Sequence, residues 1–346
     1  MQTAADNGEQ TMNTQFDVPE KIRVSVGSAI VLGLLKGKLD APPTTVYMLT
    51  YREGKCLANC GFCPQARTSS SRADMLARVT WPPFPTKQVT EKIASSAEKG
   101  KVKRVCIQAL NYPTVHKDLT NLTKLIHSNS NVPISLSCPP FAKAQFKELA
   151  EAGADRISIA LDAATEQLFN KVKGTQTKSP YQWKQQHQAL KEALEVFGKN
   201  RVYTHLIVGL GETEKEIVES IQQCMDSGIY PSLFAFTPIQ GTTLENMPQP
   251  SLKAYRRIQL ARHLIIHRKT RIENMKFDTE QRITDFGIIK TRLHQVIQEG
   301  TPFCTSGCPE CNRPYYNERP GGPIYNYPRQ PLPNEINEIM KQLNEG

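Results

Sequence analysis

Six of the nine cysteines in this 346-residue sequence stand in two short groups with the same spacing, C-x3-C-x2-C. The first group is Cys56, Cys60 and Cys63, and the second is Cys304, Cys308 and Cys311. No apolar secretory signal precedes them, and closely spaced thiols in such a chain are typical of metal sites rather than of disulfides. Each group therefore predicts an inorganic site. The remaining cysteines, Cys106, Cys138 and Cys224, are expected to be small buried apolar side chains.

Three thiolates on one short loop can hold three irons of a [4Fe–4S] cluster, which leaves the fourth iron for another ligand. Gly61 allows the backbone to fold tightly, and Phe62 offers a flat apolar face beside the last thiol. Structural zinc is the alternative, but it requires a fourth Cys or His. For the second group zinc stays open, with His294 as the nearest additional ligand in sequence.

Apolar segments alternate with amphipathic segments from residue 43 onward. The predicted strands are 45–49, 102–107, 134–137, 156–161, 202–208 and 232–236. The predicted helical stretches are 87–98, 119–127, 142–152, 165–197 with an interruption at Gly174 and Pro180, 214–226 and 252–268. This cadence predicts an α/β fold, a full or partial (β/α) TIM-type barrel with an N-terminal helical extension and a C-terminal cluster-binding tail. Its chemistry is expected on loops at the C-terminal ends of the strands.

Composition divides the chain into four expected segments. Residues 1–18 form a flexible N-terminal tail, 19–43 an N-terminal helix, 44–300 the barrel, and 301–346 a C-terminal auxiliary iron–sulfur segment. The last segment is rich in proline and tyrosine and lacks periodicity. Because long irregular segments are uncommon in compact domains, we expect a cluster to order it.

The formal net charge is +10, and the basic residues are spread along the chain without a basic arm. This distribution favours an acidic protein partner over nucleic acid. The longest apolar run, residues 24–35, is too short to span a membrane, and no signal peptide is visible. We therefore expect a cytoplasmic protein that binds neither nucleic acid nor membrane.

The first cysteine group, with Phe62 before the last thiol, matches the C-x3-C-x-aromatic-C fingerprint and resembles the radical S-adenosylmethionine (SAM) superfamily. The resemblance implies that a [4Fe–4S] cluster binds the methionine moiety of SAM and that one electron cleaves the sulfonium to a 5′-deoxyadenosyl radical. It also implies cofactor contacts from residues at the following strand ends. These are Phe62, Gln108, Asn111, Asp162, Ile207, Gly209, Glu212, Phe236 and Thr237.

Some of these positions have a simpler interpretation. Asp162 and Glu212 could instead begin the helices that follow them, where a carboxylate suits the helix dipole. Lys171 and Lys173 are expected on a solvated helix face. No side chain is assigned a catalytic role beyond the cluster ligands.

The runs IVGLGET and FTPIQGTTLE resemble the biotin synthase-like branch, and TPFCTSGCPECNRPYYNERPGG resembles the tail of archaeal-type, two-protein lipoyl synthases. The resemblance implies a second [4Fe–4S] cluster on Cys304, Cys308 and Cys311, with Ser306 as a candidate fourth ligand. It implies sulfur insertion, in which that cluster supplies the sulfur that replaces C–H by C–S at carbons 6 and 8 of a protein-bound octanoyl-lysine. The expected partners are an octanoylated acidic carrier (an H-protein or lipoyl domain), a second lipoyl synthase-like protein and a reductant such as ferredoxin.

Two alternatives remain at this point. The second cluster could serve electron transfer or substrate anchoring in a radical SAM enzyme that acts on another substrate. In a different class, the chain could be a zinc-stapled basic binding protein.

Overall fold

The computed structural model describes residues 16–344, so most of the expected flexible tail, residues 1–18, lies outside the described residues. The strands are β1 Lys21–Val24, β2 Thr45–Thr50, β3 Met75–Leu76, β4 Val79–Thr80, β5 Pro83–Pro85, β6 Arg104–Gln108, β7 Ile134–Ser137, β8 Ala154–Ser158, β9 Val202–Val208, β10 Tyr230–Ala235, β11 Lys276–Phe277 and β12 Ile283–Asp285. The α-helices are α1 Val26–Val31, α2 Thr86–Glu98, α3 Val115–Asn129, α4 Lys143–Glu151, α5 Glu166–Val172, α6 Trp183–Phe197, α7 Glu214–Asp226, α8 Leu252–Ile266, α9 Lys290–Glu299 and α10 Pro333–Asn344. Short 3₁₀ turns cover Thr175–Thr177, Ile272–Asn274 and Thr301–Phe303.

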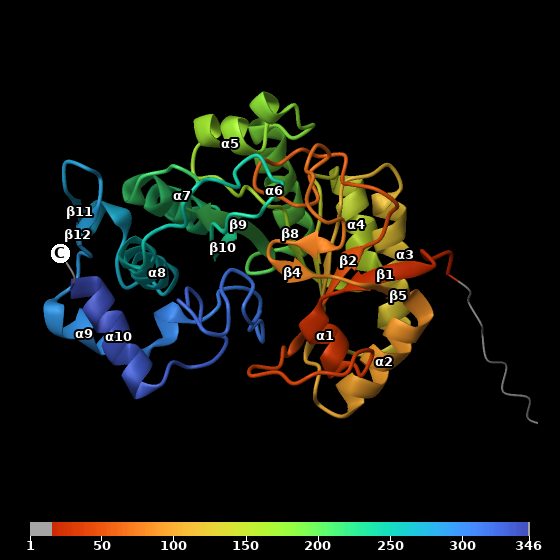
Figure 1. Ribbon diagram of the computed structural model, residues 1–346. Coiled ribbons are helices and arrows are strands. Elements are labelled where there is room, and N and C mark those ends of the chain that lie inside the picture. Colours follow the sequence, from red (N-terminus) through yellow and green to blue (C-terminus); the bar gives the residue numbers. More distant parts are fainter. Residues whose placement is uncertain (1–15, 345–346) are drawn as a thin grey trace, which may run out of the picture.

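The main sheet has eight strands in the order β10-β9-β8-β7-β6-β2-β1-β5. The strands from β2 to β10 in this sheet pair in parallel, whereas β1 and β5 add antiparallel strands at one edge. Figure 1 shows the connecting helices on the outside of the curved sheet. In the described part of the chain no pairing joins β10 to β5, so the fold is a partial (β/α) barrel that is open on one side.

Residues 19–43 do not form the predicted N-terminal helix. Lys21–Val24 is strand β1, and helix α1 that follows has only six residues. The continuous burial of Ile22, Arg23 and Val24 suits a strand between β2 and β5, and Ser25 caps the short helix by accepting a hydrogen bond from the Ser28 amide. Pairing along the edge of the sheet therefore overrides the helical pattern.

The side chains that point into the barrel alternate along each strand. Those at the N-terminal level are Tyr47, Cys106, Ser135, Arg156, Tyr203 and Ser232, and those nearer the C-terminal ends are Leu49, Gln108, Ser137, Ser158, His205 and Phe234. Many of these residues are polar, and few are the branched apolar residues that fill a packed barrel core. The barrel interior is therefore lined as a binding site and is not filled by a packed apolar core.

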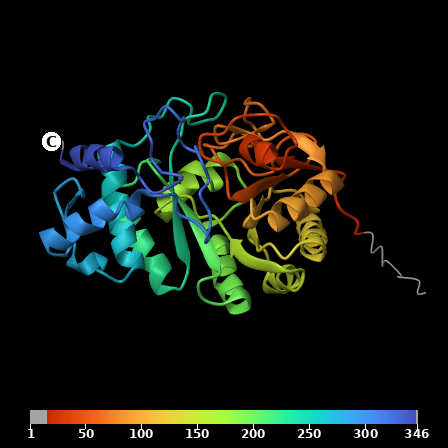
Figure 2. The same cartoon turned by 90° about the horizontal axis from the view of Figure 1, so that it is seen from below.

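Residues 304–332 form an irregular segment, the closing segment, that lies across the open side of the barrel between β2 and β10 (Figures 1 and 2). The helix α8 anchors it, because the fully buried Arg256 donates hydrogen bonds to the carbonyls of Ile324 and Tyr325. The hydroxyl of Tyr255 donates to Asn326 at 3.0 Å. Contacts made by side chains thus hold this segment in place. Helix α10 follows it and ends the described part of the chain.

No helix among residues 16–344 is long and apolar enough to span a lipid bilayer.

Candidate active site

One cavity inside the barrel is lined by thiols from both ends of the sequence. Cys56, Cys60 and Cys63 line it at the C-terminal ends of the strands. Cys308 and Cys311 of the closing segment line it as well. The first cysteine group and two thiols of the second are therefore brought to a single cavity, although about 240 positions separate the two groups in the sequence.

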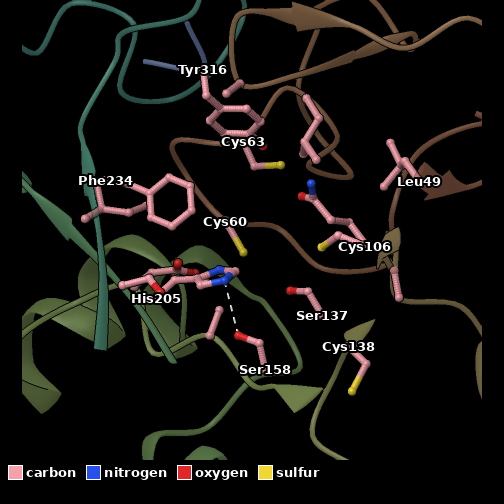
Figure 3. A pocket seen from close by; sticks show the side chains of 18 of the residues that line it. Leu49, Cys60, Cys63, Cys106, Ser137, Cys138, Ser158, His205, Phe234 and Tyr316 are labelled. Atoms are coloured by element: carbon pink, nitrogen blue, oxygen red, sulfur yellow. Dashed lines mark hydrogen bonds between the residues drawn. The ribbon is translucent and has the colours of Figure 1, made fainter. Parts of the chain in front are cut away.

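The first cysteine group lies on the loop after β2. The Cys63 amide donates to the Cys60 carbonyl at 3.0 Å, and the Cys56 amide donates to the Gln65 carbonyl at 2.9 Å, so the loop folds back on itself. The Asn111 amide donates to the Cys56 sulfur at 3.1 Å. Figure 3 shows the thiols of Cys60 and Cys63 pointing into the cavity. These three converging thiols fit the donor set of a [4Fe–4S] cluster with one open iron.

Burial raises the pKa of all three thiols, well above the ordinary value for Cys60 and to about 12 for Cys63. The positive charge of Lys173 opposes this rise for Cys60. The thiols of the metal-free protein are therefore protonated at neutral pH. Binding of iron at this loop must release their protons.

Asp162 and Lys173 form a buried ion pair beside this loop. The Lys173 ammonium lies 2.7 Å from Asp162 Oδ2, and their side chains are 5 and 12% exposed. Asp162 has a left-handed backbone (φ 67°) and bridges β9 at Leu206, so it does not start a helix. The N-cap of α5 is Thr165. The expectation of a solvated Lys173 is wrong, because residue 173 ends α5 on its inner side, whereas Lys171 is exposed.

The other predicted cofactor contacts divide into two sets. Those that line the cavity are Phe62, Gln108, Ile207, Phe236 and Thr237, together with Asp162. Asn111 contributes its backbone next to Cys56 rather than a side chain in the cavity wall. The strand ends thus place apolar faces and polar groups around the first cysteine group, as a nucleoside cofactor requires.

Gly209 and Glu212 shape the turn after β9 and do not line the cavity. The Glu212 carboxylate accepts hydrogen bonds from the amides of Gly209 at 2.6 Å and Leu210 at 3.0 Å. Gly209 has φ 101°, and a Cβ there would lie 2.7 Å from the Pro250 ring. The capping box of α7 belongs to Thr213 and Glu216, so Glu212 supports the turn rather than starting the helix.

The second cysteine group lies at the opposite, N-terminal end of the barrel. Ser135 on β7 donates a hydrogen bond to the Cys308 sulfur at 3.3 Å, and the Tyr47 hydroxyl on β2 lies 3.3 Å from the Cys311 sulfur. Cys106 on β6, between those two strands, faces the same cavity (Figure 3). Its pKa is raised by burial first and then by the neighbouring thiols of Cys308 and Cys311.

Cys304 and Ser306 are placed differently from the prediction. The Cys304 thiol points to the Arg329 carbonyl at 3.4 Å, and Cys304 does not line the cavity. The Ser306 hydroxyl accepts a hydrogen bond from the Leu233 amide at 2.7 Å on β10. Cys138 and Cys224 are buried, as expected, whereas Cys106 is only partly buried and faces the second group.

Sequence reasoning also missed His205 in the cavity wall. Burial lowers the pKa of His205 to about 4, so its imidazole is neutral at physiological pH, and its Nε2 lies 3.2 Å from Ser158 Oγ (Figure 3). The Arg313 guanidinium lies 3.7 Å from the centre of the Phe234 ring. The sequence contained one signal for His205, which stands two residues before Ile207 on β9. Alternate residues of a strand face the same side, so both residues face the cavity.

Comparisons with known proteins agree with this geometry. Residues 54–224 match the sequence profile of the Radical SAM superfamily. An uncharacterized protein of Methanocaldococcus jannaschii is 27% identical over 248 residues, which cover 68% of this chain and 57% of that protein. The matched region therefore spans little more than half of that relative.

Among solved structures, methylornithine synthase superposes with a TM-score of 0.50 at 14% identity, over 70% of this chain and 67% of that one. The [FeFe]-hydrogenase maturase HydG from Carboxydothermus hydrogenoformans also gives a TM-score of 0.50 at 14% identity, over 70% of this chain and 55% of that one. At these identities the likeness shows the fold alone.

The profile begins immediately before Cys56 and covers β6, β7, β8 and β9, and it ends before β10. It implies a [4Fe–4S] cluster and SAM as cofactors, and the three thiols of the first group fit that cluster. Residues 54–224 of the chain therefore form a radical SAM domain.

Proposed function

We propose that this enzyme inserts sulfur in the manner of a lipoyl synthase. A protein-bound octanoyl-lysine would be converted to lipoyl by replacement of C–H with C–S at carbons 6 and/or 8. The observation that carries the proposal is the shared cavity, which has the first cysteine group at one end and Cys308 and Cys311 at the other. A substrate in this cavity would lie between the group that binds SAM and a second inorganic centre.

The SAM-binding group would supply a radical that removes hydrogen from an unactivated carbon, and a second [4Fe–4S] cluster would supply sulfide. The chain's own residues hold and orient the reactants. The Asp162 carboxylate, held by Lys173, would accept hydrogen bonds from the ribose hydroxyls, and Phe62 and Phe236 would offer apolar faces. Burial of the cavity keeps water away from reactive carbon.

Support for an acidic carrier comes from charge. The net charge is +10. A second hollow beside the C-terminal mouth is lined by three arginines, Arg72, Arg78 and Arg319, against two glutamates, Glu245 and Glu318, and it shares lining residues with the main cavity. An acidic lipoyl domain or H-protein docked there would deliver its lysine arm to the mouth. The proposal further includes a reductant such as ferredoxin and a second, related synthase.

The rival enzyme function, in which the second cluster transfers electrons or anchors another substrate, uses the same cavity. The two functions differ in the fate of the sulfide in the second cluster, because only sulfur insertion consumes it. Zinc is the alternative of a different class, and it would need a fourth Cys or His beside the three thiols of a group. Acid-labile sulfide separates it from both enzyme functions, because a zinc site contains none.

The test is mass spectrometry of an octanoyl-lysine peptide after anaerobic incubation with reconstituted protein, SAM and a strong reductant. 5′-Deoxyadenosine is counted in the same sample. Gain of sulfur by the peptide, or its cross-linking to the protein's cluster, supports the proposal. If 5′-deoxyadenosine forms while the peptide stays unchanged, with and without the related synthase, the lipoyl assignment fails.

A further inference from the structure

We propose that Cys106, rather than Cys304, completes the second thiol group, so that Cys106, Cys308 and Cys311 are the ligands of the auxiliary iron–sulfur cluster. This inference rests on the second cluster of the proposed function and names its ligands. It places the site at the N-terminal ends of the barrel strands, opposite the first cysteine group.

Strand register puts Cys106 in the middle of the site. Cys106 on β6 is paired with Tyr47 on β2 and with Ser135 on β7. Residues in register in a parallel sheet point to the same face, so these three side chains form one row across the barrel wall. Cys106 is the central member of that row and its only thiol.

The closing segment brings its thiols to the two ends of this row. The Cys311 sulfur lies 3.3 Å from the Tyr47 hydroxyl, and the Cys308 sulfur accepts a hydrogen bond from Ser135 at 3.3 Å. Cys106 therefore faces the space between Cys308 and Cys311. All three residues line the same cavity wall.

Several hydrogen bonds hold the Cys308–Cys311 loop in this position. Asn312 accepts from the Thr44 amide at 3.1 Å, and the Pro309 carbonyl accepts from Arg104 Nε at 3.1 Å. The Arg313 amide donates to the Tyr47 hydroxyl at 2.8 Å. Because these anchors join the loop to the first residues of β2 and β6, the thiols are held at the base of the barrel.

Cys304 is held outside this group. Its amide donates to the Thr301 carbonyl at 3.2 Å, and its backbone bridges Tyr327. Its thiol lies 3.4 Å from the Arg329 carbonyl and 3.9 Å from the Gly300 carbonyl, on the outer side of the closing segment. The repeated C-x3-C-x2-C spacing thus has different roles at the two ends of the chain.

The two hydroxyls beside the thiols give the site a supporting layer. Hydrogen bonds to ligand sulfur raise the reduction potential of iron–sulfur clusters and orient the ligands. Ser135 is itself held by Arg104, whose Nη1 donates to its oxygen at 3.0 Å. Tyr47 and Ser135 are therefore positioning residues for the proposed cluster.

The experiment compares iron and acid-labile sulfide, with Mössbauer spectra, in anaerobically reconstituted full-length variants. Two [4Fe–4S] clusters correspond to about eight irons per chain. Cys106→Ala is expected to fall to about four irons, whereas Cys304→Ala keeps about eight. Cys224→Ala, which removes a buried thiol of α7 far from the cavity wall, is the matched control and also keeps its iron. The SAM-dependent change in the spectrum of the first cluster reports whether each variant is folded.

If Cys106→Ala fails to load even the first cluster, differential alkylation of the wild-type protein tests instead which thiols bind the auxiliary cluster. Iodoacetamide is expected to modify Cys304 both before and after iron removal, and Cys106 only after it. Loss of iron in Cys304→Ala, or full iron in Cys106→Ala, would overturn the ligand assignment. A wild-type chain that binds only about four irons would instead refute the second cluster itself, and with it the proposed function.

Discussion

Replacement of Lys173 by methionine removes one half of the buried ion pair beside the first cysteine group. The Lys173 ammonium lies 2.7 Å from Asp162 Oδ2, and both side chains are almost fully buried. At an effective dielectric constant of 20, their gross attraction is about 6 kcal/mol, most of which offsets the cost of burying both charges. Loss of one partner leaves the Asp162 carboxylate uncompensated. We expect Lys173→Met to lower the free energy of unfolding by about 3–5 kcal/mol.

The assay is urea unfolding of the metal-free chain under anaerobic conditions, with circular dichroism as the probe of unfolding. Lys171→Met, on the exposed side of the same helix, is the control and should change the free energy by less than about 0.5 kcal/mol. Adding Asp162→Asn to Lys173→Met should recover most of the loss, because no buried charge then remains. Because Asp162 is left without its orienting partner, SAM should also bind Lys173→Met more weakly. A loss below about 1 kcal/mol, or no recovery in the double variant, would refute the reasoning.

Three further substitutions test other parts of the structure. Gly209→Ala places a Cβ 2.7 Å from Pro250 at φ 101°, so thermal unfolding should show a loss of about 1–3 kcal/mol. Arg256→Met breaks the hydrogen bonds to the carbonyls that anchor the closing segment, and limited proteolysis should cut residues 304–332 many times faster than in wild type. Burial raises the pKa of Glu318 from 4.5 to about 7. The folded state therefore holds a proton that the unfolded state has lost between those values, and Glu318 alone should lower wild-type stability by about 3 kcal/mol as pH rises from 4.5 to 7, against the opposite contribution of His205, whose pKa burial lowers. Glu318→Gln should remove that fall in urea titrations across this range, and a parallel profile in both proteins would contradict it.

Much of the barrel was predictable because its helices and strands follow strong local patterns. Strand β9 and helix α7 have the predicted bounds, and strand β7 does as well. The predicted N-terminal helix was wrong, because pairing of β1 with β2 and β5 depends on residues more than twenty positions away.

The second site was less accessible to sequence reasoning. The repeated cysteine spacing indicated Cys304, yet the direction of its thiol depends on the packing of the closing segment against Tyr327 and Arg329. For Cys106 a signal was present, since it stands two residues before Gln108 on one strand and must face the same side. Which thiols it would meet depends on a tail some two hundred residues later, and only tertiary packing brings the two together.

In the proposed function, sulfur comes from a second iron–sulfur cluster of this chain, across the shared cavity. The most direct measurement is single-turnover mass spectrometry with protein reconstituted with ³⁴S-labelled sulfide, in the presence of unlabelled cysteine and the related synthase. The account predicts ³⁴S in the lipoyl product and an equal loss of acid-labile sulfide from the protein, while Cys308→Ala forms 5′-deoxyadenosine without sulfur transfer. Product that carries only unlabelled sulfur, or turnover with no loss of cluster sulfide, would contradict it.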